Sequence, residues 1–182
     1  MSTLQILFVA LAAGLSLFWL GIAVVGPRKI DLPNIVAVLR YGSVLRTLAL
    51  ILALLPAMIT IYVVAVFPWK SDRMLAYAGG SLLATCLIAG LLLIEVARSQ
   101  VCLTEDGIIR YSPWAGRSEL LWSEIERIRY SNVNSWFVLL GEGRTIRVSR
   151  HFRGVKAFVE TVKSKIAAER CASAAAAMDA IQ

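Results

Sequence analysis

The chain has 182 residues, of which 58% are hydrophobic and only 17% charged, and its formal net charge is +7. Soluble domains usually have about a quarter charged residues, so this composition argues against a soluble globular protein and favours a membrane protein. The charged residues are concentrated after residue 97, where 13 of the 19 Lys and Arg and 9 of the 12 Asp and Glu occur.

Three long apolar runs precede that point, and we predict that each forms a transmembrane helix. They cover about residues 4–26, 47–69 and 75–97. Each holds roughly the 20 apolar residues that cross about 30 Å of hydrocarbon, where the backbone must satisfy its own hydrogen bonds. The opening "MSTLQ" has no positive side chain and the run is long, so we expect a retained helix rather than a cleaved signal peptide.

The segment between the first two runs is basic, with Arg28, Lys29, Arg40 and Arg46 against Asp31. The positive-inside tendency therefore places this loop and the C-terminal part in the cytoplasm, with the N-terminus and "KSDR" outside. Within this segment, residues 31–46 are interpreted as a short helix on the membrane surface or a helical extension of the second span. The simpler alternative is a basic loop with no further role.

The third run carries a small-residue motif and the one ionisable residue within a span. Gly80 and Ala84 are four residues apart, a spacing that lets another helix approach closely. Glu95 lies three residues before Arg98, a spacing that allows an interfacial ion pair. The alternative for Glu95 is a role in proton or ion transfer.

From Arg98 onward the hydrophobic period changes to two, which predicts strands. The strands are "QVCLT", "IIRYS", "SELLW", "IERIRY", "WFVLL" and "RTIRVS", joined by turn sequences such as "EDG" and "GEG". The alternation places Ile128 and Ile146 inward, with Arg127, Arg129 and Arg147 outward. A helical stripe follows, formed by Phe152, Val155, Phe158, Val159, Val162 and Ile166.

Three phrases of this part resemble the bacterial pleckstrin-homology-like domain family. They are "LTEDG" at 103–107, "WSEI" at 122–125 and "FRGVKAF" at 152–158, and the resemblance covers about residues 98–168. It implies an α+β membrane protein, in which three transmembrane helices precede a small antiparallel sheet or barrel closed by a C-terminal helix. It also implies a binding or assembly module in the bacterial inner membrane. We count six strands, whereas the full fold has seven, so one strand is short or supplied elsewhere.

The predicted organisation is therefore a transmembrane region over 1–97, a cytoplasmic pleckstrin-homology-like domain over 98–170 and an alanine-rich tail over 171–182. The tail is expected to extend the last helix, to remain loose or to bind a partner. Cys86, Cys102 and Cys171 show no pairing pattern and are expected to be reduced.

The candidate binding residues are basic: Arg127, Arg129, Arg144, Arg147, Arg150 and Arg153. A domain held beside an anionic leaflet gains about 1 kcal/mol for each nearby basic group. The alternative is a solvated sheet face in which these arginines alternate with Glu124, Glu126 and Glu142.

We identify no catalytic, cofactor-binding or metal-binding residues and no nucleic-acid-binding motif in the sequence. The single histidine, His151, has no Ser, Cys or Asp placed by a motif to act with it. The first hypothesis is a non-enzymatic accessory subunit that binds other membrane protein subunits and membrane lipids. The second is a sensor of anionic lipids, and the third is transport or catalysis through Glu95 or His151.

Overall fold

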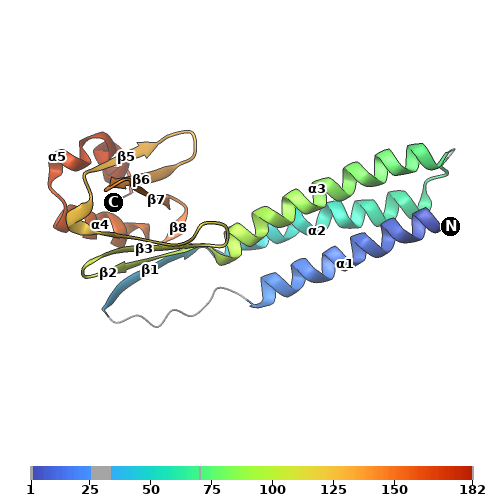
Figure 1. Cartoon of the computed structure of the whole chain (residues 1–182), viewed down its shortest axis with the longest axis horizontal. Helices are drawn as coiled ribbons and strands as arrows, with labels where there is room; N and C mark the ends of the chain where they lie inside the picture. Colours follow the sequence, from blue (N-terminus) through green and yellow to red (C-terminus); the bar gives the residue numbers. More distant parts are fainter. Residues whose placement is uncertain (1, 26–33, 70, 182) are drawn as a thin grey trace. The chain divides into compact units, whose positions relative to one another are not determined.

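The structure, a computed structural model, describes residues 2–25, 34–69 and 71–181. The chain divides into two compact units, one formed by residues 1–26 and 43–97 and the other by residues 27–42 and 98–182. Figure 1 shows three long helices in the first unit and the strands and short helices in the second. Of the predicted loop charges, Arg28, Lys29, Asp31 and Lys70 lie outside the described residues.

The first unit consists of α1 (Thr3–Val25), α2 (Ser43–Val66) and α3 (Asp72–Arg98, of which Arg98 belongs to the second unit). All three are long and apolar enough to cross a membrane, which confirms the three predicted helices and supports a multi-pass membrane protein. The Gln5 side chain donates a hydrogen bond from Nε2 to the carbonyl oxygen of Val64 at 3.0 Å, so the start of α1 lies beside the end of α2.

Aromatic residues of α1 pack against glycines of α3. A Cβ atom added to Gly90 would clash with the Trp19 ring, and one added to Gly79 would lie 3.0 Å from the Phe8 ring. Phe8 and Trp19 are eleven residues apart, as are Gly79 and Gly90, which corresponds to about three helical turns. The two helices are therefore parallel. Small residues of α2 complete this core, namely Ala49, Ala53 and Ala57.

The helix predicted within residues 31–46 is wrong for Ile35–Tyr41, which forms strand β1. This strand pairs antiparallel with β2 (Gln100–Thr104), so the α2–α3 helix pair is inserted between two adjacent strands of one sheet. The segment that precedes the second span therefore belongs to the sheet unit, and the observed unit boundary differs from the predicted one at residue 97. This strand was not among the six counted from the sequence.

Five strands form the first sheet, in the order β4-β3-β2-β1-β8. Its other members are β3 (Gly107–Ser112), β4 (Gly116–Leu121) and β8 (Phe152–Arg153). The tight turn after β2 depends on Thr104, whose hydroxyl accepts the Gly107 N–H at 3.0 Å and donates to the Gly107 carbonyl oxygen at 2.9 Å. At Gly107 a Cβ atom would lie only 2.5 Å from the Leu120 carbonyl oxygen, so this position requires glycine.

The second sheet consists of β5 (Arg127–Ser131), β6 (Trp136–Gly141) and β7 (Arg144–Ser149), paired in that order. All six strands expected after residue 98 are thus present. One local prediction is wrong, because Trp122 starts a short 3₁₀ helix, η1 (Trp122–Glu124), rather than ending a strand. In the described part of the chain the two sheets remain separate, so neither closes into the barrel that was one of the expected forms.

Both sheets share one core with α4 (Val155–Lys165). Ile128 and Ile146, which the period of two placed inward, are fully buried. On α4, Phe158, Val159 and Val162 face this core as the stripe predicted, while Phe152 reaches it from β8.

The alanine-rich tail folds back onto this core instead of extending α4. It forms α5 (Ala168–Cys171), η2 (Ala172–Ala174) and α6 (Ala175–Asp179). Cys171, Ala174 and Met178 are buried in the core. The Ser173 hydroxyl and the Arg170 guanidinium donate 2.8 Å hydrogen bonds to the carbonyl oxygens of Ile128 and Ile125, respectively. The tail therefore covers the open edge of β5, which limits pairing of that edge with another strand.

Candidate functional site

The outward side of the three-stranded sheet combines an apolar centre with basic flanks. Antiparallel pairing places Arg127 opposite Leu140, and places Val138 opposite both Arg129 and Arg147. Since directly paired residues share one side of a sheet, these side chains are neighbours. We call this surface the β5–β7 face and define it by Arg127, Arg129, Trp136, Val138, Leu140 and Arg147.

The centre of the β5–β7 face is the outward row of β6. Trp136, Val138 and Leu140 are half-buried there, whereas the three flanking arginines are exposed. The guanidinium carbon of Arg147 lies 5.4 Å from the Trp136 ring centroid, a cation–π distance that holds both side chains on the surface.

All charged side chains of the β5–β7 face are positive. The other outward positions of β5, β6 and β7 are Ser131, Thr145 and Ser149, so these positions include no carboxylate. Arg127, Arg129 and Arg147 have no ion pair with any residue that the structure describes. A Trp and several Arg around an apolar centre are the residue types that contribute most to binding at protein interfaces.

The remaining predicted arginines lie elsewhere. Arg144 stands at the start of β7 and donates a long hydrogen bond of 3.5 Å to the Glu119 carbonyl oxygen on β4. Arg150 is exposed in the turn after β7, and Arg153 lies on β8, paired with Arg40 of β1. The structure therefore distributes the six arginines over four places, namely the β5–β7 face, the start of β7, the turn after β7 and β8.

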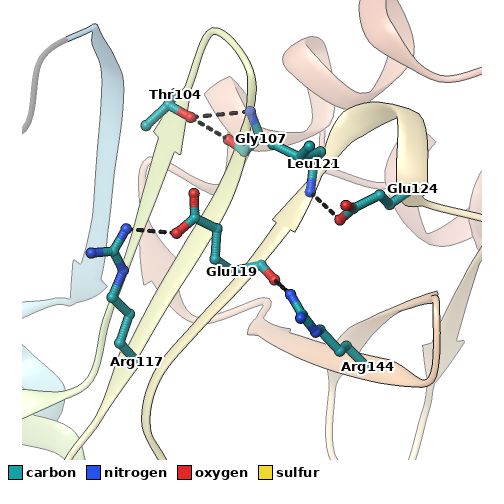
Figure 2. Close-up of polar contacts among 7 residues, drawn as sticks. All are labelled: Thr104, Gly107, Arg117, Glu119, Leu121, Glu124 and Arg144. Atoms are coloured by element: carbon teal, nitrogen blue, oxygen red, sulfur yellow. Dashed lines mark hydrogen bonds and ion pairs between the residues drawn. The ribbon is translucent and has the colours of Figure 1, made fainter.

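A groove between β4 and β7 contains Arg144 and a second arginine that the sequence did not single out. Figure 2 shows Arg117 and Arg144 approaching Glu119 from the two strands. The groove measures about 540 Å³ and is lined by Arg117, Ser118, Glu119, Arg144 and Thr145. Arg117 forms a 2.6 Å ion pair with Glu119, and this hydrogen bond and charge raise the pKa of the guanidinium. Both partners are exposed, so this ion pair contributes little to stability.

Another basic array lies at one end of the five-stranded sheet. Successive pairings align one residue of each strand at the same level. We call this array the end row; from β4 to β8 it consists of Arg117, Tyr111, Gln100, Arg40 and Arg153. Sequence reasoning missed it because Arg40 was assigned to a helix or loop, and only strand register aligns it with Arg153 and Arg117.

The residues considered for chemistry do not gather at one place in the structure. His151 is exposed in the turn after β7, where its backbone N–H donates to the Ser149 hydroxyl at 3.2 Å. Glu95 lies on α3 and buries its Oε2 atom, and its pairing with Arg98 stays a prediction. Among the described residues, no group of three or more His, Cys, Asp or Glu could hold a metal ion.

Gly80 and Ala84 lie on an exposed side of α3 within this chain. Nothing approaches within 4 Å of a Cβ atom added to Gly80, and the adjacent Gly79 carries the contact with α1 instead. Packing of Gly80 and Ala84 against a helix of another chain stays a prediction.

No protein-family model, curated protein sequence or solved structure matches the chain.

Proposed function

We propose that the chain is a non-enzymatic membrane subunit, whose sheet unit binds and stabilises a larger membrane protein complex through the β5–β7 face. The observation that carries this proposal is the half-buried row of Trp136, Val138 and Leu140. It lies between arginines that form no ion pair with any described residue. A partner of matching chemistry has an apolar centre and acidic residues around it.

The topology supports a subunit with its binding unit on one side of a membrane. Two helices, α2 and α3, separate β1 from β2, and these strands pair. An even number of spans returns the chain to the side it left, which agrees with two crossings between the strands. The excess of Lys and Arg on that side favours the cytoplasm of a bacterial inner membrane.

The pleckstrin-homology-like identity belongs to the same proposal. What supports it is the two antiparallel sheets, with β1 supplied from before the helix pair, and α4 on their common core. Folds of this kind host many ligands, so fold alone does not name the ligand. A single anionic-lipid site made of the six predicted arginines has less support, because they lie in four places.

Photo-crosslinking on the full chain in its native membrane tests the proposed function. A photoreactive amino acid replaces Val138 at the centre of the β5–β7 face, and in a matched sample it replaces Glu160 on the exposed side of α4. We expect a discrete protein adduct from position 138 and none from position 160. Adducts with lipid alone, or identical adducts from both positions, would overturn the proposal.

Charge reversal then tests the chemistry of the partner. Arg129→Glu combined with Arg147→Glu should abolish the adduct at position 138, whereas Lys165→Glu on α4 changes charge outside the β5–β7 face and should leave it intact. An adduct that survives the double reversal would show that its formation does not depend on acidic groups of the partner.

A further inference from the structure

An exposed tryptophan stands at the end of the five-stranded sheet from which the helix pair departs. Trp114 lies in the β3–β4 turn and its side chain is 57% exposed. In the register, Tyr111 pairs with Gln100, the first residue of β2, so residues 113–115 project beyond the start of that strand.

The turn holds Trp114 in place. The Ser112 hydroxyl accepts the backbone N–H groups of Trp114 at 3.3 Å and Ala115 at 3.4 Å. Gly116 closes the turn with a φ of 70°, a conformation that favours glycine. The indole is thus presented outward by an ordered hairpin, without burial in the core.

Few residues of the chain separate this end of the sheet from two membrane helices. Only Gly42 separates β1 from α2, and only Ser99 separates α3 from β2. Arg40 and Gln100 of the end row are therefore only a few residues along the chain from the start of α2 and the end of α3. Each residue of a strand adds about 3.3 Å. The end row contributes three arginines at this level, from β1, β4 and β8.

The chemistry of the two features fits a membrane surface. Tryptophan prefers the boundary between hydrocarbon and headgroups, where its ring is apolar and its N–H still finds a partner. Arginine binds phosphate oxygens with two parallel hydrogen bonds. The exposed Arg117–Glu119 ion pair leaves guanidinium donors of Arg117 accessible to a phosphate.

We propose that Trp114 and the arginines of the end row bind the headgroup layer of the membrane that α2 and α3 cross, with a preference for anionic phospholipids. Trp114 enters the interfacial layer, and Arg40, Arg117 and Arg153 bind lipid phosphates. This contact involves neither the β5–β7 face nor its partner, so it does not depend on the proposed function.

Fluorescence quenching by lipids with a headgroup nitroxide tests the proposal. The full chain is placed in phosphatidylcholine vesicles, with or without phosphatidylglycerol, and carries a thiol-reactive bimane at Ala115→Cys or Asp106→Cys. Both positions are exposed, but Asp106 lies in the β2–β3 turn at the opposite end of the same strands. The three native thiols are buried, so the labelled unmodified chain provides the blank.

We expect several-fold stronger quenching at position 115 than at position 106, increased by phosphatidylglycerol. Trp114→Ala should reduce quenching at position 115, and Arg117→Gln should reduce the increase caused by phosphatidylglycerol. Tethering by the helices alone would also bring position 115 near the membrane. Quenching that is independent of Trp114 and of lipid charge would therefore overturn the proposal, as would equal quenching at both positions.

Discussion

Arg40 donates a 3.1 Å hydrogen bond from Nε to the side-chain oxygen of Gln100, and this bond joins the two strands between which the α2–α3 helix pair is inserted. Gln100 is buried, and the next inward pair, Leu39 and Val101, is fully buried in the core of the sheet unit. The sheet unit is therefore completed by residues that precede two membrane helices.

This arrangement predicts that residues 98–182 do not fold stably by themselves. Without β1, strand β2 loses one of its two antiparallel partners and the core loses Leu39. A fragment in which a short Gly-Ser linker joins residues 34–42 to residues 98–182 should unfold cooperatively in urea, as followed by circular dichroism. In that joined fragment, Leu39→Ala should reduce the free energy of unfolding by about 2–5 kcal/mol. Equal stability of the two fragments would contradict the role of β1.

The Trp19–Gly90 contact predicts different effects for two glycines of α3. Gly90→Ala places a methyl group in the Trp19 ring and should destabilise the helix bundle by about 1–3 kcal/mol through overpacking. Gly80→Ala is the matched control, because no atom lies within 4 Å of the added methyl group. Alanine favours a helix over glycine by about 1 kcal/mol, so Gly80→Ala should be neutral or stabilising. Unfolding of the full chain in mixed micelles measures the change in the free energy of unfolding for both variants.

Gly80 also allows a test of the predicted packing against another chain. Gly80→Leu should leave the stability of the monomer unchanged and reduce self-association or binding to a partner helix, because a larger side chain prevents close approach. Crosslinking in native membranes measures the association. Unchanged association would show that this side of α3 faces lipid.

The β2–β3 turn predicts a specific role for Thr104. Thr104→Val keeps the shape of the side chain but removes both hydrogen bonds with Gly107, and should cost about 1–3 kcal/mol. Thr145→Val is the control, because the Thr145 side chain on β7 is exposed. It should change the free energy of unfolding by less than about 0.5 kcal/mol. Urea unfolding of the joined fragment gives both values, and equal effects would contradict the role of Thr104.

The folded tail predicts that Cys171 reacts slowly until the tail is released. Burial raises the pKa of the Cys171 thiol, so little thiolate is present in the folded chain. Arg170→Ala combined with Ser173→Ala removes the hydrogen bonds to the Ile125 and Ile128 carbonyl oxygens and should speed alkylation of Cys171 several-fold. Cys102, buried in β2, is the internal control and should keep its rate.

Burial of the cysteine thiols also determines how the stability of the fold changes with pH. Burial raises the pKa of Cys102 as well, with a smaller opposing effect of the Arg40 charge. A raised folded-state pKa makes ionisation easier in the unfolded chain. Stability from these thiols is thus complete below the unfolded-state pKa and declines as the pH rises through the folded-state pKa. Cys102→Ser and Cys171→Ser variants should show a smaller loss of stability in alkaline urea titrations.

Local sequence patterns predicted most of the secondary structure correctly. The apolar runs identified three helices because membrane-spanning length is a property of one continuous segment. The period of two identified six strands and their inward residues, including Ile128 and Ile146. It failed at Ile35–Tyr41, where apolar residues next to a span resemble a helix and the pairing partner lies about 60 residues away.

The sequence by itself determined the membrane helices, the alternating faces of the later strands and the outward position of Arg127, Arg129 and Arg147. Only the tertiary structure showed that β1 completes the sheet, that the tail covers β5 and that Arg40 aligns with Arg117 and Arg153. The physical reason is that burial periodicity is set within a single segment. Strand order, register and edge protection depend on hydrogen bonds between residues far apart in the chain.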